Sequence, residues 1–198
     1  MNEAIFVLGI GGSTRPSSTT ELALGVSLTA AAAAGAETLM LGSADLLLPL
    51  FEPDGHTRAP KAVRLLEEVR RADGLIIASP GYHGAISGMV KNALDYLEDM
   101  RNDDPPYLDG KPVGPIATAS GWQATMSTVM SLRSIVHALR GWPTPMGATI
   151  NTAGRIFDEQ GECVDPVARF QLELVGQQVA EFARMRAAVA ATRAGAEG

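Results

Sequence analysis

The stretch 11–20, GGSTRPSSTT, restricts the possible folds of this chain more than any other segment. It follows an apolar run at 4–10 that is typical of a buried strand, and it precedes a segment from Glu21 onward that is typical of a helix. A strand, a small hydroxyl-rich loop and a helix N-terminus in this order form an anion site, because glycines let the backbone approach and the first helical N–H groups are unpaired. Arg15 adds a guanidinium suited to forked contacts with phosphate oxygens. We therefore predict that this loop binds a phosphate group.

The same loop also fits a simpler interpretation, a capped helix without a ligand. Ser18 suits the N-cap position, and Glu21 stands three residues later, as in a capping box. A cap accounts for these two residues, but it leaves Ser13 and Arg15 without a role. We favour ligand binding and keep the plain cap as the alternative.

Two common nucleotide-binding motifs do not match this region. The P-loop pattern requires a lysine, and the loop 11–20 contains none. Gly9-Ile10-Gly11 begins like a dinucleotide fingerprint, but Thr14 occupies the position of the third glycine. The dinucleotide motif also needs an acidic residue about twenty positions later to bind the ribose, and Glu37 is the nearest candidate. The sequence therefore gives little support to a P-loop or Rossmann site.

Composition and charge exclude some classes of function. The chain has 198 residues and a net charge of -6, which argues against nucleic acid as the main partner because such binding needs a basic face. Its single cysteine, Cys163, excludes an intramolecular disulfide, suits a reducing compartment and is expected to be a bystander. No basic leader precedes the first strand, and no apolar run reaches the roughly eighteen residues of a membrane span. We expect a cytoplasmic protein.

Apolar strands alternate with helix-forming segments along the chain. Strands are predicted at 4–10, 37–41, 74–79, 113–120 and 143–150, and helices at 19–34, 60–72, 88–100, 126–140 and 166–189. This alternation predicts an α/β fold, a three-layer sandwich around a five-stranded parallel sheet. We expect a single domain over 1–192, with a frayed tail at 193–198.

Three loops rich in glycine and serine follow predicted strands, at 11–20, 80–87 and 120–125. Ligands of open α/β sheets bind outside the carboxyl ends of the strands, so these loops should face one crevice. We predict that the second loop forms a rigid wall for a flat heteroaromatic ring, and that backbone groups of the third loop contact the same ring from its other edge. The residues concerned are Pro80, Gly81, Tyr82, His83 and Gly84, with Ser120 and Gly121.

The tyrosine, histidine and tryptophan side chains of these loops each have two interpretations. Tyr82 and His83 line or close a ligand site, or they form an exposed turn. We expect His83 to line the site rather than to transfer protons. Trp122 is either a core residue or an interface anchor. The other histidines, His56 and His137, fall in different segments, so the sequence gives no support to a metal cluster.

Taken together, the motifs of these loops resemble those of the NADPH-dependent FMN reductase family, a group of flavodoxin-like proteins. The resemblance covers roughly residues 4–150, and it implies a sheet with the strand order 2-1-3-4-5. It rests on Gly12-Ser13-Thr14-Arg15 followed by Ser18, on Ser79-Pro80-Gly81-Tyr82-His83-Gly84 with Lys91-Asn92-Ala93-Leu94-Asp95, and on Ala119-Ser120-Gly121 ahead of Leu132-Arg133.

The resemblance implies that FMN binds in the predicted crevice. The FMN phosphate would lie in the first loop, the isoalloxazine ring along the second, and the third loop at the far edge of the ring. The implied FMN-binding residues are Ser13, Arg15, Ser18, Thr19 and Thr20 for the phosphate, Pro80, Gly81, Tyr82, His83 and Gly84 for the ring, and Ser120 and Gly121 for its far edge.

The resemblance also implies the reaction. NAD(P)H and the acceptor take turns on the exposed flavin face, so NADPH or NADH needs no separate dinucleotide motif. We expect hydride transfer from NAD(P)H to flavin N5 and onward to a flavin, quinone or other small acceptor, with no catalytic side chain because the flavin carries the chemistry. Implied partners are a second copy of the chain, in a homodimer or homotetramer, and a flavin-dependent monooxygenase. The alternative is a flavodoxin-like electron carrier or a non-catalytic flavin-binding module.

Overall fold

The centre of the sheet is formed by β1 (Phe6–Gly11) and β3 (Gly74–Tyr82), where the sequence has its near-continuous apolar runs. The computed structural model describes residues 4–55 and 57–196. The other elements, in chain order, are α1 (Thr19–Ala33), β2 (Glu37–Leu41), α2 (Pro60–Arg71), β4 (Ala85–Ile86), α3 (Gly88–Asp95), the 3-10 turn η1 (Tyr96–Met100), β5 (Pro112–Ala119), α4 (Trp122–Ala138), β6 (Trp142–Pro143), β7 (Ala148–Asn151) and α5 (Pro166–Ala196).

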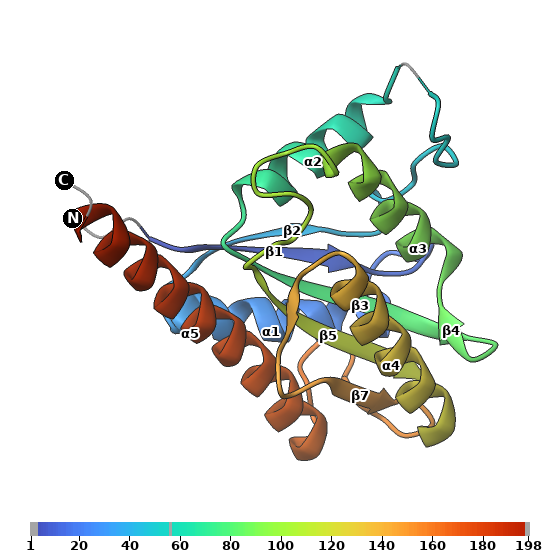
Figure 1. The fold of residues 1–198 in the computed structure, drawn as a ribbon. Helices are drawn as coiled ribbons and strands as arrows, with labels where there is room; N and C mark the ends of the chain where they lie inside the picture. Colours follow the sequence, from blue (N-terminus) through green and yellow to red (C-terminus); the bar gives the residue numbers. More distant parts are fainter. Residues whose placement is uncertain (1–3, 56, 197–198) are drawn as a thin grey trace.

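The strand order is β2-β1-β3-β5, and the short strands β6 and β7 both pair with β5. All of these pairs are parallel. Helices α2, α3 and α4 cover one face of the sheet, whereas α1 and α5 lie side by side against the other (Figure 1). The predicted three-layer sandwich and its strand order are confirmed.

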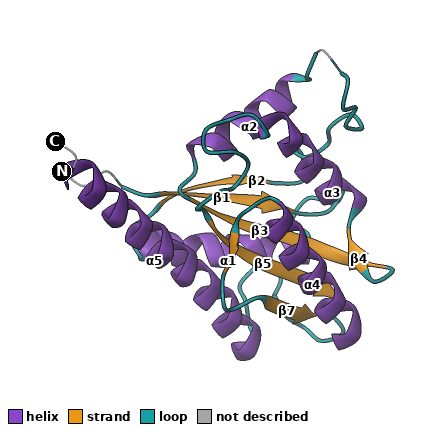
Figure 2. Cartoon of the chain, in the orientation of Figure 1, coloured by secondary structure: helices purple, strands orange, loops and turns teal. Residues whose placement is uncertain are grey.

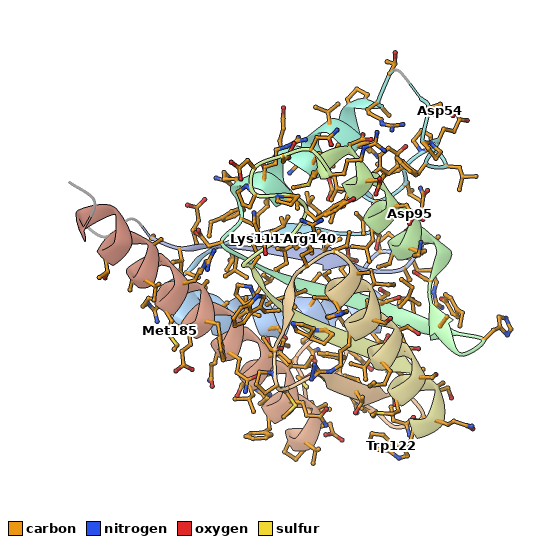
Figure 3. The ribbon with its side chains drawn as sticks, viewed as in Figure 1. Asp54, Asp95, Lys111, Trp122, Arg140 and Met185 are labelled. Carbon is orange, nitrogen blue, oxygen red and sulfur yellow. The ribbon has the colours of Figure 1, made fainter. Side chains whose placement is uncertain are left out.

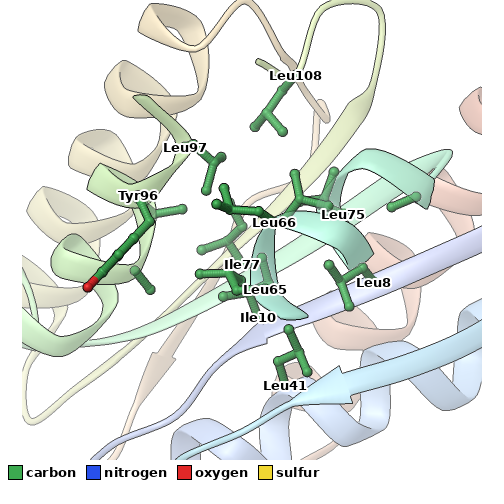
Figure 4. Packing of buried hydrophobic residues seen from close by; sticks show 14 of the residues in the cluster. Leu8, Ile10, Leu41, Leu65, Leu66, Leu75, Ile77, Tyr96, Leu97 and Leu108 are labelled. Carbon is green, nitrogen blue, oxygen red and sulfur yellow. The ribbon is translucent and has the colours of Figure 1, made fainter. Parts of the chain in front are cut away.

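Each face of the sheet has its own apolar core, and alternate side chains along a strand belong to one core or the other. In β1, Phe6, Leu8 and Ile10 belong to the core beneath α2 and α3, shown in Figure 4. The intervening Val7 belongs to the core beneath α1 and α5. Successive side chains of a strand point to opposite faces, so a strand buried on both faces must be apolar throughout.

The segment 80–87, expected as a loop, is instead largely a hairpin. Strand β3 continues to Tyr82 and pairs antiparallel with β4, and this hairpin projects from one end of the sheet (Figure 2). The two connecting residues, His83 and Gly84, have φ values of 51° and 87°. Positive φ at both central residues is the pattern of a type I′ turn, whose twist matches paired strands. A two-residue turn ending in glycine was the sequence signal for this hairpin.

The predicted strand 143–150 is interrupted. It is divided into β6 and β7, and the carbonyls of Thr144 and Pro145 between them accept hydrogen bonds from Arg133 at 2.8 and 2.9 Å. Pro145 has no N–H to donate to a neighbouring strand, which favours the break. Helix α4 begins at Trp122 rather than 126, and the predicted helix 88–100 is α-helical only to Asp95 before it tightens into η1.

Helix α5 extends to Ala196, beyond the predicted end at 189. Residues 197 and 198 of the expected frayed tail lie outside the described residues. Over the ranges that are described, no helix combines the length and the apolar character that crossing a membrane requires.

The loop between β2 and α2 packs against α3 and η1 rather than extending into solvent. The side chain of Asn92 accepts a hydrogen bond from the Phe51 N–H at 2.8 Å and donates one to the Pro49 carbonyl at 2.8 Å. Arg58 closes the loop with two hydrogen bonds to Asp99, at 2.7 and 2.8 Å. Asn92, which belongs to one of the motifs on which the family resemblance rests, therefore has a scaffolding role.

Candidate functional site

The loop between β1 and α1 leaves donors unused at the start of the helix. Ser18 caps α1, and its hydroxyl accepts from the Glu21 N–H at 3.3 Å. Within the described chain, the N–H groups of Ser18, Thr19 and Thr20 donate to no other group. The Arg15 guanidinium is exposed and forms no ion pair with a described residue. These groups are arranged as an anion site at the positive end of the helix dipole.

Glu21 fixes the shape of this loop. Its carboxylate accepts one hydrogen bond from the Ser17 N–H at 2.8 Å and another from the Ser43 N–H at 2.9 Å. The expected capping box is therefore only half formed, because the carboxylate bonds to Ser17 and Ser43 rather than to the N–H of Ser18. Ser17 has a φ of 53°, a left-handed conformation that its bond to Glu21 stabilises. Glu21 thus ties the loop to the end of β2.

A pocket of about 360 Å³ brings the three predicted loops together at the carboxyl edge of the sheet. Its lining contains residues predicted from all three: Ser13, Arg15, Ser18, Thr19, Thr20, Pro80, Gly81, Tyr82 and Ser120. His83, Gly84 and Gly121 do not line it. A larger groove of about 750 Å³ runs along α1 and the start of α5, but it contains none of the predicted site residues.

The wall of the pocket on the hairpin side depends on a close contact with α4. A Cβ atom at Gly81 would lie 2.4 Å from the Thr128 hydroxyl oxygen, which is nearer than packed atoms approach. Glycine therefore lets the end of β3 lie flat against α4. Tyr82 is exposed beside the pocket, whereas His83 and Gly84 form the exposed hairpin tip. For His83, the structure thus favours the exposed-turn interpretation.

A second helix N-terminus approaches the pocket from the third loop. The Gly121 N–H donates to the side-chain oxygen of Asn151 at 2.9 Å, which fixes the start of α4. No side chain caps this helix, and the N–H groups of Trp122, Gln123 and Ala124 have no acceptor among the described residues. Two helix N-termini with unused donors therefore flank the pocket.

Trp122 lies on the surface at the start of α4 (Figure 3), with 62% of its surface exposed. The core interpretation of this residue is therefore wrong.

The pocket also contains residues that the sequence reasoning missed, namely Thr118, Ala119, Ala124 and Thr152. Thr118 precedes the end of β5 by one residue and pairs in register with Pro80. Its hydroxyl lies 2.6 Å from the hydroxyl of Thr20. The only available signal was its position near a strand end, because the contact joins residues far apart in the sequence.

Metal ligands and the thiol of Cys163 are the other groups in the described ranges that could carry chemistry. No group of three or more His, Cys, Asp or Glu residues in the described ranges is arranged to hold a metal ion. Cys163 is buried, and this burial raises the pKa of its thiol. A raised thiol pKa disfavours the nucleophilic thiolate at neutral pH, as expected for a bystander.

Fold and pocket together define a flavodoxin-like α/β protein with a candidate anion site at the carboxyl edge of its sheet. Solved structures share this fold. One is FerB, a flavoenzyme NAD(P)H:(acceptor) oxidoreductase from Paracoccus denitrificans, with a TM-score of 0.75 at 20% identity over 92% of this chain and 99% of that one. A flavodoxin, WrbA-like protein from Agrobacterium tumefaciens has a TM-score of 0.64 at 14% identity, over 92% and 99% of the two chains.

The chain belongs to the NADPH-dependent FMN reductase family, whose model matches residues 5–154. It is 30% identical to an NAD(P)H-dependent FMN reductase of Pseudomonas aeruginosa, over 90% of this chain and 94% of the relative. It is also 36% identical to an FMN-dependent NADPH-azoreductase of Staphylococcus aureus, over 60% of each chain. The predicted enzyme class, an NAD(P)H-dependent FMN reductase, is confirmed by this membership.

Proposed function

We propose that this chain binds FMN in the 360 Å³ pocket, with the phosphate at the start of α1 and the ring between the hairpin and the third loop. The observation that carries this proposal is the unused donors at the first turn of α1, which open onto the same pocket as the flat hairpin wall. A phosphate supplies the acceptors that these N–H groups lack. The residues present therefore fit FMN.

In this proposal the phosphate is held by the side chains of Ser13, Arg15 and Ser18, together with the backbone at Thr19 and Thr20. The ring lies along Pro80, Gly81 and Tyr82, with Ser120 at its far edge. His83, Gly84 and Gly121 act indirectly, because the first two shape the hairpin turn and the third sets the start of α4.

The protein's contribution to the reaction is position and electrostatics. Bound FMN supplies the chemistry that moves a hydride from NAD(P)H to a small acceptor such as a flavin or quinone. The unpaired N–H groups at the start of α4 stabilise negative charge that develops at the nearby ring edge. No side chain in the pocket is required as a nucleophile. The open side of the pocket, beside exposed Tyr82, admits NAD(P)H and the acceptor in turn.

A visible absorption spectrum of the purified protein with added FMN tests this proposal. We expect bound flavin that bleaches on anaerobic addition of NADPH or NADH, and the faster donor identifies the preferred nucleotide. Flavin that binds but bleaches with neither donor would favour the electron-carrier alternative. Protein that binds no flavin would overturn both readings of the site.

We further propose a homodimer or homotetramer, with α4 contributing to the interface. Trp122, Met126 and Met130 recur every four residues along α4, and each has at least half of its surface exposed. Residues four apart lie on one helix face, so these side chains form an apolar stripe that a second copy would cover. We expect Met126→Glu to lower the mass measured by light scattering to that of a smaller assembly. An unchanged mass in a multimeric protein would assign the interface to another face.

A flavin-dependent monooxygenase is a proposed partner, since it would consume reduced FMN released from an open pocket. The proposed location is the cytoplasm, where the single buried Cys163 would stay reduced.

A further inference from the structure

Two hydroxyl groups meet at the floor of the pocket. The oxygen atoms of Thr20, on the first turn of α1, and Thr118, near the end of β5, are 2.6 Å apart. Both residues line the pocket, yet they are only 2% and 4% exposed. This contact is the only hydrogen bond that either hydroxyl forms with a described residue.

Counting hydrogens shows that this pair is incomplete. Each hydroxyl carries one hydrogen, and the bond between the two oxygens uses one of them. The second hydrogen has no acceptor in the described part of the chain. Because leaving a buried donor unpaired is costly, this hydrogen is available to an acceptor that enters the pocket.

The surroundings indicate which hydroxyl carries the free hydrogen. Thr118 lies in β5 between two strands, in register with Pro80 of β3 and Ile150 of β7, so its position is fixed by ladders on both sides. Thr20 lies beside the unused N–H groups at the start of α1. Because Thr20 belongs to the same first turn of α1 as these N–H groups, we assign the free hydrogen to Thr20.

We infer that Thr118 is a positioning residue, whose hydroxyl donates to Thr20 and thereby directs the Thr20 hydrogen toward a phosphate oxygen of the bound cofactor. This inference rests on the proposed FMN site and deepens it. Thr118 sits on a different strand from the phosphate loop, so it links the anion site to the part of the sheet beneath the ring.

The test is the Kd for FMN and for riboflavin, which lacks the phosphate, measured by quenching of flavin fluorescence. Thr118→Val, which removes the hydroxyl at nearly constant size, is expected to raise the Kd for FMN about five- to tenfold and to leave that for riboflavin unchanged. Thr118→Ser keeps the hydroxyl and should stay within about twofold of the wild type. Because the two residues act as one unit, Thr20→Val combined with Thr118→Val should be no worse than Thr20→Val alone.

Three results would overturn the inference: an unchanged Kd for FMN in Thr118→Val, equal losses for FMN and riboflavin, or additive losses in the double variant. Thermal unfolding identifies a variant that does not fold, and Thr118→Ala then takes the place of Thr118→Val in the same comparison. Wild-type protein that binds neither flavin would instead refute the proposed FMN site. The two failures are therefore distinguishable.

Discussion

Replacing Arg15 with alanine is expected to raise the Kd for FMN by about 10- to 100-fold, while hydride transfer in the flavin-saturated enzyme changes by less than about threefold. The guanidinium lines the pocket and has no carboxylate partner among the described residues. Its charge is therefore available to a phosphate, and a charged hydrogen bond contributes about 1.5–3 kcal/mol. The phosphate is far from the reacting part of the cofactor, so binding should suffer more than chemistry.

Titration of FMN and of riboflavin, followed by stopped-flow reduction at saturating flavin, separates the two effects. Arg15→Lys should recover only part of the affinity, because an ammonium keeps the positive charge but cannot form the two parallel hydrogen bonds of a guanidinium. Arg101→Ala is the matched control, since Arg101 is an exposed arginine that pairs with Glu98 and does not line the pocket. An unchanged Kd for FMN in Arg15→Ala would show that the phosphate does not bind at this loop.

Replacing Gly176 with alanine is expected to destabilise the fold by about 2–3 kcal/mol, or about 4–12 °C in Tm. Gly176 lies where α5 crosses α1, and a Cβ atom there would be 2.0 Å from the backbone oxygen of Ser27. The crossing is also held by the Ser27 hydroxyl, which donates to the Leu172 carbonyl at 2.7 Å. Backbone lies on both sides of this contact, so the two helices must separate to accept a methyl group.

Gly25 provides the matched control for this substitution. It is also a glycine within a helix, but a Cβ atom there would meet only the end of the Met40 side chain, at 3.7 Å. Gly25→Ala should therefore stabilise the protein by about 0.5–1 kcal/mol through helix propensity alone. Thermal and urea unfolding of both variants will show whether the free energy of unfolding falls in Gly176→Ala and rises in Gly25→Ala. Equal or higher stability in Gly176→Ala would show that the helices do not pack this closely.

Much of the fold could be predicted because its signals are local. The apolar run of β1 and the capped start of α1 at Ser18 each depend on neighbours in the chain, and both elements formed where expected. The hairpin after Pro80 was missed because its signal is weak: histidine is an uncommon first residue for a turn that needs positive φ twice. The start of α4 was missed because Trp122 begins the helix without a capping side chain.

The candidate site was likewise predictable where its signals are local and not where it depends on packing. Loops 11–20, 80–87 and 120–125 were identifiable because residues that suit a ligand follow apolar strands, and parallel strands deliver their carboxyl ends to one edge. Most of the predicted residues line the pocket, but the sequence could not show which residues at the hairpin tip are excluded from it. Tyr82, at the end of β3, lines the pocket. His83 does not, because it is the first residue of the turn that reverses the chain between β3 and β4.

The class of fold followed from the sequence, and the chemistry of the first loop predicted a phosphate site, because strand periodicity, helix caps and loop chemistry are properties of adjacent residues. The order of the strands was instead implied by the resemblance of the loop motifs to a known family. The sequence could not show that Glu21 bonds to Ser43, that Gly81 must lack a side chain because of Thr128, or that Thr118 contacts Thr20. Each of these contacts joins residues from different elements. Their distances are set by how helices and strands pack, which no local pattern in the chain specifies.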